Sequence, residues 1–354
     1  MMKIYAGFDS GGSTTRCLLS DEKGNALGMG KSGPSNFLFC GKEMAAHHIQ
    51  ECLQLALKQA KDRGLLPNPA ADYQDGSFSL EGIFVASAAV EVFDGKTHAD
   101  FFQEVTGCQN TGCDSDILPV WYAGTRPRFS PAICSIAGTG AVTYLLSGNR
   151  FVKSSGWGPL FGDEGAGYDI GRKALQLASR MSDLREPMDP VFYQAVLDFY
   201  HVSAAHPRRL LRAVMQVADD GIGTDTRSRV AAVTRCVDQL AEEGNESAGK
   251  LFAQAAEDAS ASVRAVIARS AQEDPYDWTP RDSGEMFTLV LSGGLFREKS
   301  PLYRALCRTL SRESRLTGIT IPKVSAVQSA ASIALYQNGR SEAAEHLMEQ
   351  IYES

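Results

Sequence analysis

Two glycine-rich turns, each placed directly after a short apolar strand, constrain the fold of this chain more than any other feature. The first turn is Asp9-Ser10-Gly11-Gly12-Ser13-Thr14-Thr15, and the second is Gly138-Thr139-Gly140. Each is followed by two further strand-like segments, Arg16–Ser20 and Ala26–Lys31 after the first, and Ala141–Leu146 and Arg150–Lys153 after the second. The sequence therefore predicts two three-stranded meanders. From Gly12 to Gly140 is 128 residues, about one domain length, which predicts two α/β domains built on the same unit.

The chemistry of the first turn favours binding of a phosphate group. Glycine lets backbone N–H groups approach an anion closely, because no β-carbon stands in the way, and the neighbouring hydroxyls add donors. A carboxylate would repel a bare phosphate, so Asp9 is better explained as facing a metal ion that the phosphate shares. The alternative is an ordinary Gly-Gly hairpin on a solvent-exposed edge. A third turn of the same kind, Gly293-Gly294, follows the strand-like segment Thr288–Ser292.

Length and composition limit the class of protein. A chain of 354 residues with 44% hydrophobic and 22% charged residues is long enough for two globular domains. Its net charge of −7 argues against nucleic-acid binding, which usually needs a basic face. There is no apolar run near the ~18 residues of a membrane span, and the N-terminus has no signal-peptide pattern. Eight scattered cysteines suit a reducing cytoplasm, so we expect a cytoplasmic protein without a membrane partner.

The most distinctive stretch follows the second meander. It reads Gly156-Trp157-Gly158-Pro159-Leu160-Phe161-Gly162-Asp163-Glu164-Gly165-Ala166-Gly167-Tyr168-Asp169-Ile170-Gly171. With the three glycine turns in this order, the chain resembles the BadF/BadG/BcrA/BcrD ATPase family, and within it the N-acetylglucosamine kinase-like sugar kinases of the actin, Hsp70 and hexokinase superfamily. The resemblance implies two ribonuclease H-like domains around a central cleft for ATP and sugar.

The resemblance also assigns the nucleotide site. It implies that ATP and Mg²⁺ are the cofactors and that Asp9 faces the metal. The first phosphate loop would contain Gly11, Gly12, Ser13, Thr14 and Thr15, the second Gly138, Thr139 and Gly140, and the adenosine loop Gly293 and Gly294.

The same resemblance places the sugar against residues from both domains. These residues are Asn36, Ser87, Asp116, Thr139, Trp157 and Asp163. Simpler explanations exist for three of them. Asn36 could cap a Gly-Pro turn, Asp163 could complement a helix dipole where Gly162–Gly165 opens a helix, and Asp116 could be a helix N-cap.

Asp116 is the expected catalytic base, because the family's catalytic aspartate lies at such a strand end before an apolar helix. Asp114 would point the same way on an extended strand and is the second candidate. Ser115 and the segment Ile117-Leu118-Pro119 depart from the family's usual pattern, so the register stays open between the two aspartates.

These observations predict domains over residues 1–119 and 120–330, with residues 331–354 as C-terminal helices packing back on the body. Residues 172–275 predict a helical insert in the second domain. We expect a homodimeric, ATP-dependent amino-sugar kinase, with N-acetylglucosamine or glucosamine phosphorylated on a hydroxyl, most simply O6. The alternatives are a kinase of N-acetylmuramic acid or another hexose, an ATPase activator of a radical dehydratase, and a non-catalytic sensor. For the activator, Cys108 and Cys113 are the one pair that could hold a shared iron–sulfur cluster, and their spacing and position do not fit.

Overall fold

Two compact units make up the chain. The computed structural model describes residues 1–11, 14–66, 78–87, 90, 95–126, 129–216, 226–272 and 279–350, without the side chains of residues 38 and 39. Contacts group residues 1–130 with 322–354 as the first unit, and residues 131–321 as the second. Compared with the boundaries expected from the sequence, residues 120–130 and 322–330 group with the first unit.

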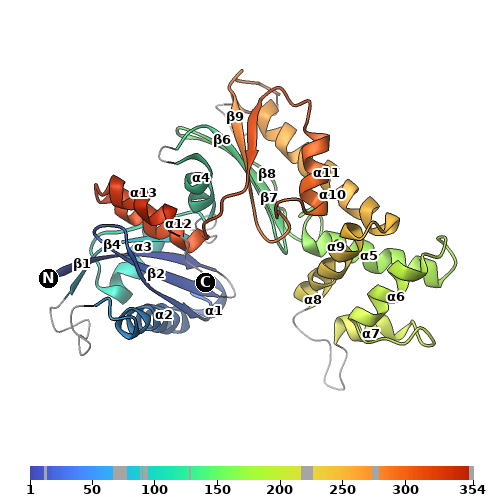
Figure 1. Ribbon diagram of the computed structural model, residues 1–354, viewed down its shortest axis with the longest axis horizontal. Coiled ribbons are helices and arrows are strands. Elements are labelled where there is room, and N and C mark those ends of the chain that lie inside the picture. Colours follow the sequence, from blue (N-terminus) through green and yellow to red (C-terminus); the bar gives the residue numbers. More distant parts are fainter. Residues whose placement is uncertain are drawn as a thin grey trace. The chain divides into compact units, whose positions relative to one another are not determined.

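A five-stranded sheet with the order β3-β2-β1-β4-β5 forms the centre of the first unit (Figure 1). The neighbours β1, β2 and β3 are antiparallel, whereas β4 and β5 run parallel to β1. The strands are β1 (Met2–Ser10), β2 (Thr15–Asp21), β3 (Ala26–Ser32), β4 (Phe78–Ser87) and β5 (Thr111–Asp114).

Helices cover both faces of this sheet, which explains why β1 is apolar along most of its length. They are α1 (Phe37–Cys40), α2 (Lys42–Asp62), α3 (Gly95–Thr106), α4 (Ile117–Thr125), α12 (Ala326–Gln337) and α13 (Ser341–Glu349). The late helix α12 lies directly on β1: a β-carbon at Gly7 would stand 2.0 Å from the backbone nitrogen of Ala331. This contact ties the end of the chain to its first strand. α12 and α13 are the C-terminal helices that the sequence predicts to pack back on the body.

The second unit repeats the same topology. Its sheet has the order β10-β9-β6-β7-β8, with β6, β7 and β8 antiparallel and with β9 and β10 parallel to β6. The strands are β6 (Ala132–Ala137), β7 (Ala141–Ser147), β8 (Arg150–Ser155), β9 (Phe287–Ser292) and β10 (Leu316–Thr320). In both units a meander is extended by two parallel strands on the side of its first strand. The predicted pair of ribonuclease H-like domains is therefore confirmed.

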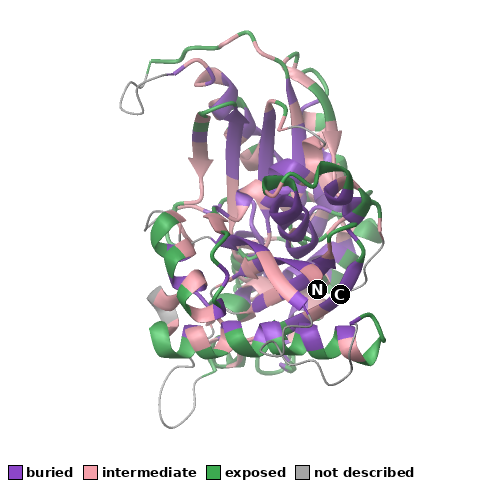
Figure 2. Ribbon diagram, turned by 90° about the vertical axis from the view of Figure 1, so that its left-hand side faces the viewer, coloured by how far each residue is buried: buried purple, intermediate pink, exposed green. Residues whose placement is uncertain are grey.

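Helices dominate the described residues between β8 and β9, the part of the chain in which the sequence predicts a helical insert. They are α5 (Gly167–Ser182), α6 (Pro190–Phe199), α7 (Arg209–Met215), α8 (Thr226–Ala232), α9 (Thr234–Glu242) and α10 (Glu246–Ala268); α11 (Pro301–Thr309) follows β9. The core of this unit includes Leu145 and Leu289 of the sheet together with Phe252 of α10. Figure 2 shows the central strands as buried. Among the helices of the described residues, none has both the length and the apolar character needed to cross a membrane.

Candidate functional site

The first glycine turn connects the end of β1 to the start of β2. Ser10 pairs with Thr15, and the Gly11 N–H donates to the carbonyl oxygen of Thr14 at 3.1 Å. A β-carbon on Gly11 would stand 2.7 Å from that carbonyl oxygen, so the tight turn requires glycine. Gly12 and Ser13, which are expected in the phosphate loop, lie outside the described residues.

Asp9 lies one residue before the end of β1, at the edge where the turn begins. Its carboxylate is 3.5 Å from the guanidinium of Arg16 on β2, the residue opposite it in the register. Burial raises the pKa of Asp9 above its ordinary value, and Arg16 opposes that rise. A partly desolvated carboxylate therefore lies beside the first glycine turn.

A cluster of buried hydroxyls joins this turn to the next loop. The Ser35 hydroxyl lies 2.7 Å from that of Ser10 and accepts a hydrogen bond from the Thr15 hydroxyl at 2.6 Å. All three side chains are buried, and so is the neighbouring Asn36. Ser35 therefore holds the loop that carries Asn36 against the ends of β1 and β2. Reasoning from the sequence missed Ser35; its position beside Asn36 in the Gly-Pro loop was the available signal.

The strand ends of the first sheet collect further candidates at the same edge. Ser87 ends β4 and pairs in register with Ser10, and its side chain is fully buried. The next strand, β5, ends at Asp114, which pairs with Ala86 of β4. The carboxyl ends of parallel strands are where open α/β sheets bind ligands.

Asp114 and Asp116 stand in different surroundings. Asp114 is exposed, and its carboxylate accepts a hydrogen bond from the Ser115 N–H at 2.6 Å. Asp116 is half-buried at the N-cap position of α4, yet its side chain makes no capping hydrogen bond to that helix. The Ser115 hydroxyl approaches its Oδ1 at 3.3 Å. The simple capping explanation of Asp116 therefore lacks its defining hydrogen bond.

In the second unit, the turn at Gly138–Gly140 connects β6 to β7 and receives the start of α5. The Gly138 N–H donates to the Gly140 carbonyl at 2.9 Å. The carbonyl oxygens of Gly138 and Thr139 accept from the N–H groups of Gly167 and Tyr168, at 2.8 and 3.1 Å. The first residues of α5 are thus fixed directly on the turn.

Asp163 lies in the loop before α5, buried and in the left-handed region with φ of 56°. Its Oδ2 accepts a hydrogen bond from Nη2 of Arg227 at 2.9 Å. Because α5 begins at Gly167, the acidic residue of its first turn is Asp169, so the helix-dipole explanation applies to Asp169 and not to Asp163. Trp157 is 71% exposed. Its β-carbon packs against Gly162, where an added β-carbon would stand only 2.6 Å away.

The third glycine turn, at Gly293-Gly294, lies beside the second one within the second unit. Gly293 has φ of 96°, and a β-carbon there would stand 2.4 Å from the carbonyl oxygen of Ala137, the last residue of β6. The Leu295 N–H donates to that same oxygen at 3.1 Å. A cavity of about 380 Å³ lies there. Its lining includes Gly138, Thr139, Gly294, Ala231, Ala232 and Arg297.

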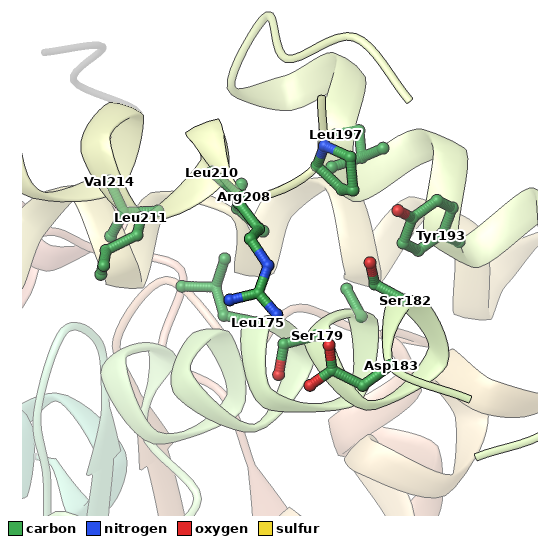
Figure 3. A pocket seen from close by; sticks show the side chains of 12 residues that line it. Leu175, Ser179, Ser182, Asp183, Tyr193, Leu197, Arg208, Leu210, Leu211 and Val214 are labelled. Carbon is green, nitrogen blue, oxygen red and sulfur yellow. The ribbon is translucent and has the colours of Figure 1, made fainter. Parts of the chain in front are cut away.

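Another cavity, of about 490 Å³, lies among α5, α6 and α7, where Figure 3 shows Arg208 reaching toward α5. Leu175, Leu197 and Val214 contribute apolar side chains to its lining, and none of the residues expected in the site from the sequence lines it. We therefore place the candidate site at the turns and not in this cavity.

Comparisons with known proteins find relatives of this chain among sugar kinases. The chain is 26% identical over 267 residues to an N-acetylmuramic acid/N-acetylglucosamine kinase of Clostridium acetobutylicum, covering 75% of this chain and 80% of that protein. It is 26% identical over 186 residues to an N-acetyl-D-glucosamine kinase of Dictyostelium discoideum, covering 51% of this chain and 56% of that one.

The fold resembles the crystal structure of a candidate N-acetylglucosamine kinase from Chromobacterium violaceum. The TM-score is 0.65 at 24% identity, with 94% of this chain and 98% of that chain covered. A family model matches residues 6–334, which include all three glycine turns. The chain belongs to the BadF/BadG/BcrA/BcrD ATPase family.

Proposed function

We propose that this protein is an ATP-dependent kinase of amino sugars, with N-acetylglucosamine as its first substrate and glucosamine as its second. The observation that carries the proposal is the cavity of about 380 Å³, because the second phosphate turn and the expected adenosine loop line it together. The names of the relatives from Clostridium and Dictyostelium support the substrate class.

The nucleotide fits this cavity by size and by the character of its lining. Gly138 and Gly294 carry no side chains, and a β-carbon at either position would meet no atom of the described residues within 4 Å, so both leave space in front of the main chain. Ala231 and Ala232 offer a small apolar surface suited to a purine ring. We infer that the phosphates extend from there along the turn at Gly138–Gly140, with the first turn at Gly11 as their second binding loop.

Asp9 suits Mg²⁺ bound through the nucleotide. Mg²⁺ is usually held by one or two carboxylates together with substrate phosphates and water, so one carboxylate at the first turn is sufficient. Within the part of the chain that the structure describes, no group of three or more His, Cys, Asp or Glu side chains could hold a metal ion. When bound, Mg²⁺ would neutralise phosphate charge during transfer.

The sugar would be held by Asn36, Ser87, Thr139, Trp157 and Asp163, with Asp116 as the base. A carboxylate that makes no capping hydrogen bond to its own helix can accept the proton of the attacking hydroxyl, most simply that of O6. Asp163 and Asn36 are buried polar side chains: the Asp163 carboxylate can accept hydrogen bonds from other sugar hydroxyls, and the Asn36 amide can accept and donate them. We assign the same sugar site to N-acetylmuramic acid as a further candidate substrate.

The iron–sulfur activator is less well supported. Cys108 is buried with its thiol donating to the Leu80 carbonyl, and burial raises the pKa of Cys113 to about 12. The Cys108 thiol is thus engaged by the backbone of its own unit, and the spacing of the two cysteines does not fit the paired cysteines of such an activator.

We also propose that the protein acts in the cytoplasm as a homodimer. All eight cysteines are free thiols, as expected in a reducing compartment. Light scattering of the purified protein measures the oligomeric state.

The function is tested by an ATP-coupled assay across N-acetylglucosamine, glucosamine, N-acetylmuramic acid, N-acetylmannosamine and glucose. We expect the highest kcat/KM for N-acetylglucosamine, and mass spectrometry with NMR of the product identifies the phosphorylated hydroxyl. Absence of turnover on every sugar, while ATP binds, would overturn the proposal.

A further inference from the structure

We propose that Arg227 is a further catalytic residue, whose guanidinium contacts the phosphoryl group during its transfer from ATP. The inference rests on the proposed kinase function and assigns a role to a residue in the helical insert, where the sequence shows no motif. Four observations in the second unit support it: the position of Arg227 over the glycine turn, its ion pair with a buried carboxylate, its partial exposure, and its place on a helix that lines the nucleotide cavity.

Arg227 lies over the second glycine turn. A β-carbon on Gly140 would stand 3.0 Å from Nη2 of Arg227. The guanidinium therefore occupies the space directly in front of that glycine. A phosphate cradled by the turn would lie beside a permanent positive charge.

Asp163 holds the guanidinium in this position. The Nη2–Oδ2 distance is 2.9 Å, and the Asp163 side chain is only 6% exposed, so the carboxylate is a fixed anchor. The side chain of Arg227 is 48% exposed, and Asp163 is its one hydrogen-bond partner among the described residues. A guanidinium has five N–H donors, so one bond to Asp163 leaves others directed to solvent in front of the turn.

The helix that carries Arg227 also lines the nucleotide cavity. Arg227 is the second residue of α8, and the following Ser228, Ala231 and Ala232 line the same cavity as Gly138 and Gly294. We infer that the base-binding part of the cavity is next to Ala231 and Gly294. The terminal phosphate would then lie at the turn, next to Arg227.

The chemistry of phosphoryl transfer gives such a cation its use. The sugar oxygen forms a bond to the γ-phosphorus while the bond from that phosphorus to the β,γ-bridging oxygen breaks; ADP leaves, and Asp116 takes the hydroxyl proton. Negative charge is spread over the three equatorial oxygens of the transferred group, where a guanidinium can donate two N–H bonds. In other phosphoryl-transfer enzymes an arginine in this role contributes about 10³–10⁵-fold to kcat.

A purely structural ion pair is the competing explanation, and the chain offers a matched control for it. Arg172 pairs with Asp169 at 3.0 Å, and the two side chains are 51% and 9% exposed, nearly as in the Arg227–Asp163 pair. Asp169 keeps a second partner in Lys173 at 2.7 Å, so removal of Arg172 leaves that carboxylate paired. Arg172 lies on α5, about one helical turn after Asp169, and it is not among the residues that line the nucleotide cavity.

The test compares Arg227→Gln, Arg227→Lys and Arg172→Gln in the full-length protein. We expect Arg227→Gln to lower kcat by about 10²-fold or more, with much smaller changes in the KM values for sugar and ATP. Arg227→Lys should recover part of the rate, because it restores the charge without the planar fork. Arg172→Gln should retain the kcat of the wild-type protein.

Binding of nucleotides supplies a second readout that needs no turnover. Calorimetry compares ADP with a β,γ-imido analogue of ATP, in the presence of Mg²⁺. We expect wild-type protein to prefer the analogue, and Arg227→Gln to lose that preference while its affinity for ADP is unchanged.

Three results would overturn the proposal. One is an unchanged preference for the analogue in Arg227→Gln, and another is a raised KM for sugar at an unchanged kcat, which would mean that Arg227 only orients Asp163. The third result concerns Arg227→Lys and is decisive if thermal unfolding shows that Arg227→Gln does not fold. An Arg227→Lys variant with the kcat of the wild-type protein and the same preference for the ATP analogue over ADP would refute the contact. If wild-type protein turns over no sugar, the kinase function fails, while the nucleotide-binding comparison still decides the role of Arg227.

Discussion

Gly140 and Asp163 are so close that a β-carbon on Gly140 would stand 2.8 Å from Oδ2 of the aspartate. The glycine turn expected to bind phosphate and the carboxylate expected to bind sugar are therefore one packed structure within the second unit. The loop before α5 cannot move away easily, because the Gly167 N–H is bonded to the Gly138 carbonyl at 2.8 Å. If the two ligands bind as proposed, this steric contact would couple their positions.

The first prediction is that Gly140→Ala lowers kcat/KM for sugar phosphorylation by about 10–100-fold, because a displacement of about 1 Å at a reacting centre can cost that much. The added methyl group must push Asp163 and Arg227 aside. Steady-state kinetics measures the change. Gly249→Ala on α10 is the control, since a β-carbon there meets no atom in the described part of the chain within 4 Å and alanine favours the helix. Equal rates for both variants would show that the contact has no catalytic consequence.

The second prediction concerns the buried hydroxyl cluster. We expect Ser35→Ala to lower the free energy of unfolding by about 1–3 kcal/mol, because the buried hydroxyls of Ser10 and Thr15 both lose a partner. Urea unfolding measures the loss. Ser20→Ala is the matched control: the Ser20 hydroxyl is buried in β2 and has no hydrogen-bond partner among the described residues, so its removal should be neutral or stabilising. Similar losses in the two variants would contradict the role given to Ser35.

The meanders were predictable from the sequence because their signals are local. Strand periodicity and glycine turns placed Arg16–Ser20 and Ala26–Lys31, and the structure has β2 and β3 at Thr15–Asp21 and Ala26–Ser32. Each strand is fixed by its own apolar residues and by the turn that precedes it. The same local signals predicted the repeat of this unit around Gly138.

Contacts between distant segments could not be predicted in the same way. Arg227 meets Asp163 across 64 residues, and no pattern within a helical insert indicates which of its arginines faces a turn. The packing of the C-terminal helices on the body was expected, but the contact itself depends on Gly7 fitting against the backbone of Ala331, and neither segment carries a local signal for the other. The sequence predicted a helix start at Gly162–Gly165, but α5 begins at Gly167, because Asp163 and Gly165 both have left-handed backbone that a helix does not allow.

The third prediction is a pH dependence that comes from Asp169. Burial alone would raise its pKa, but hydrogen bonds from Lys173 and the Gly165 N–H, with the nearby positive charges, outweigh burial and lower the pKa below its ordinary value. A lowered folded-state pKa gives stability above the unfolded pKa of about 3.9, and this stability is lost as the pH falls through the folded value.

Asp169→Asn should therefore destabilise the protein at neutral pH, and the difference from wild type should shrink below about pH 4. Urea unfolding across the pH range measures this difference. Asp62→Asn removes an exposed pair with Lys58 and should change stability little at any pH. A difference between Asp169→Asn and wild type that does not vary with pH would exclude the titration of Asp169 as its cause.

The fourth prediction places Asn36 in the sugar site. Loss of hydrogen bonds to a buried polar ligand costs about 1–3 kcal/mol, so Asn36→Ala should raise the KM for sugar about tenfold or more and leave the KM for ATP nearly unchanged. Kinetics with each substrate varied in turn measures the two constants. Asn149→Ala, in the exposed turn between β7 and β8, is the control. A rise in the KM for ATP instead would move Asn36 out of the sugar site.

The fifth prediction separates the two aspartates at the end of β5. Asp116→Asn should lower kcat by about 10²–10⁴-fold, because an amide keeps the shape of the side chain but is a far weaker proton acceptor than a carboxylate. Asp116 is the better candidate because it is half-buried and makes no capping hydrogen bond, whereas Asp114 is exposed and its carboxylate is bonded to the Ser115 N–H. Asp114→Asn should therefore keep most of the rate.

Calorimetry of sugar binding must accompany the kinetics, since a misfolded variant would imitate an inactive one. We expect both variants to bind sugar with affinities near that of the wild-type protein. If Asp114→Asn were inactive and Asp116→Asn active, the base would be at the strand end and the register proposed here would be off by two residues. If both variants phosphorylated sugar at the wild-type rate, neither carboxylate would be the base, because removing the proton acceptor must slow attack by a hydroxyl of high pKa.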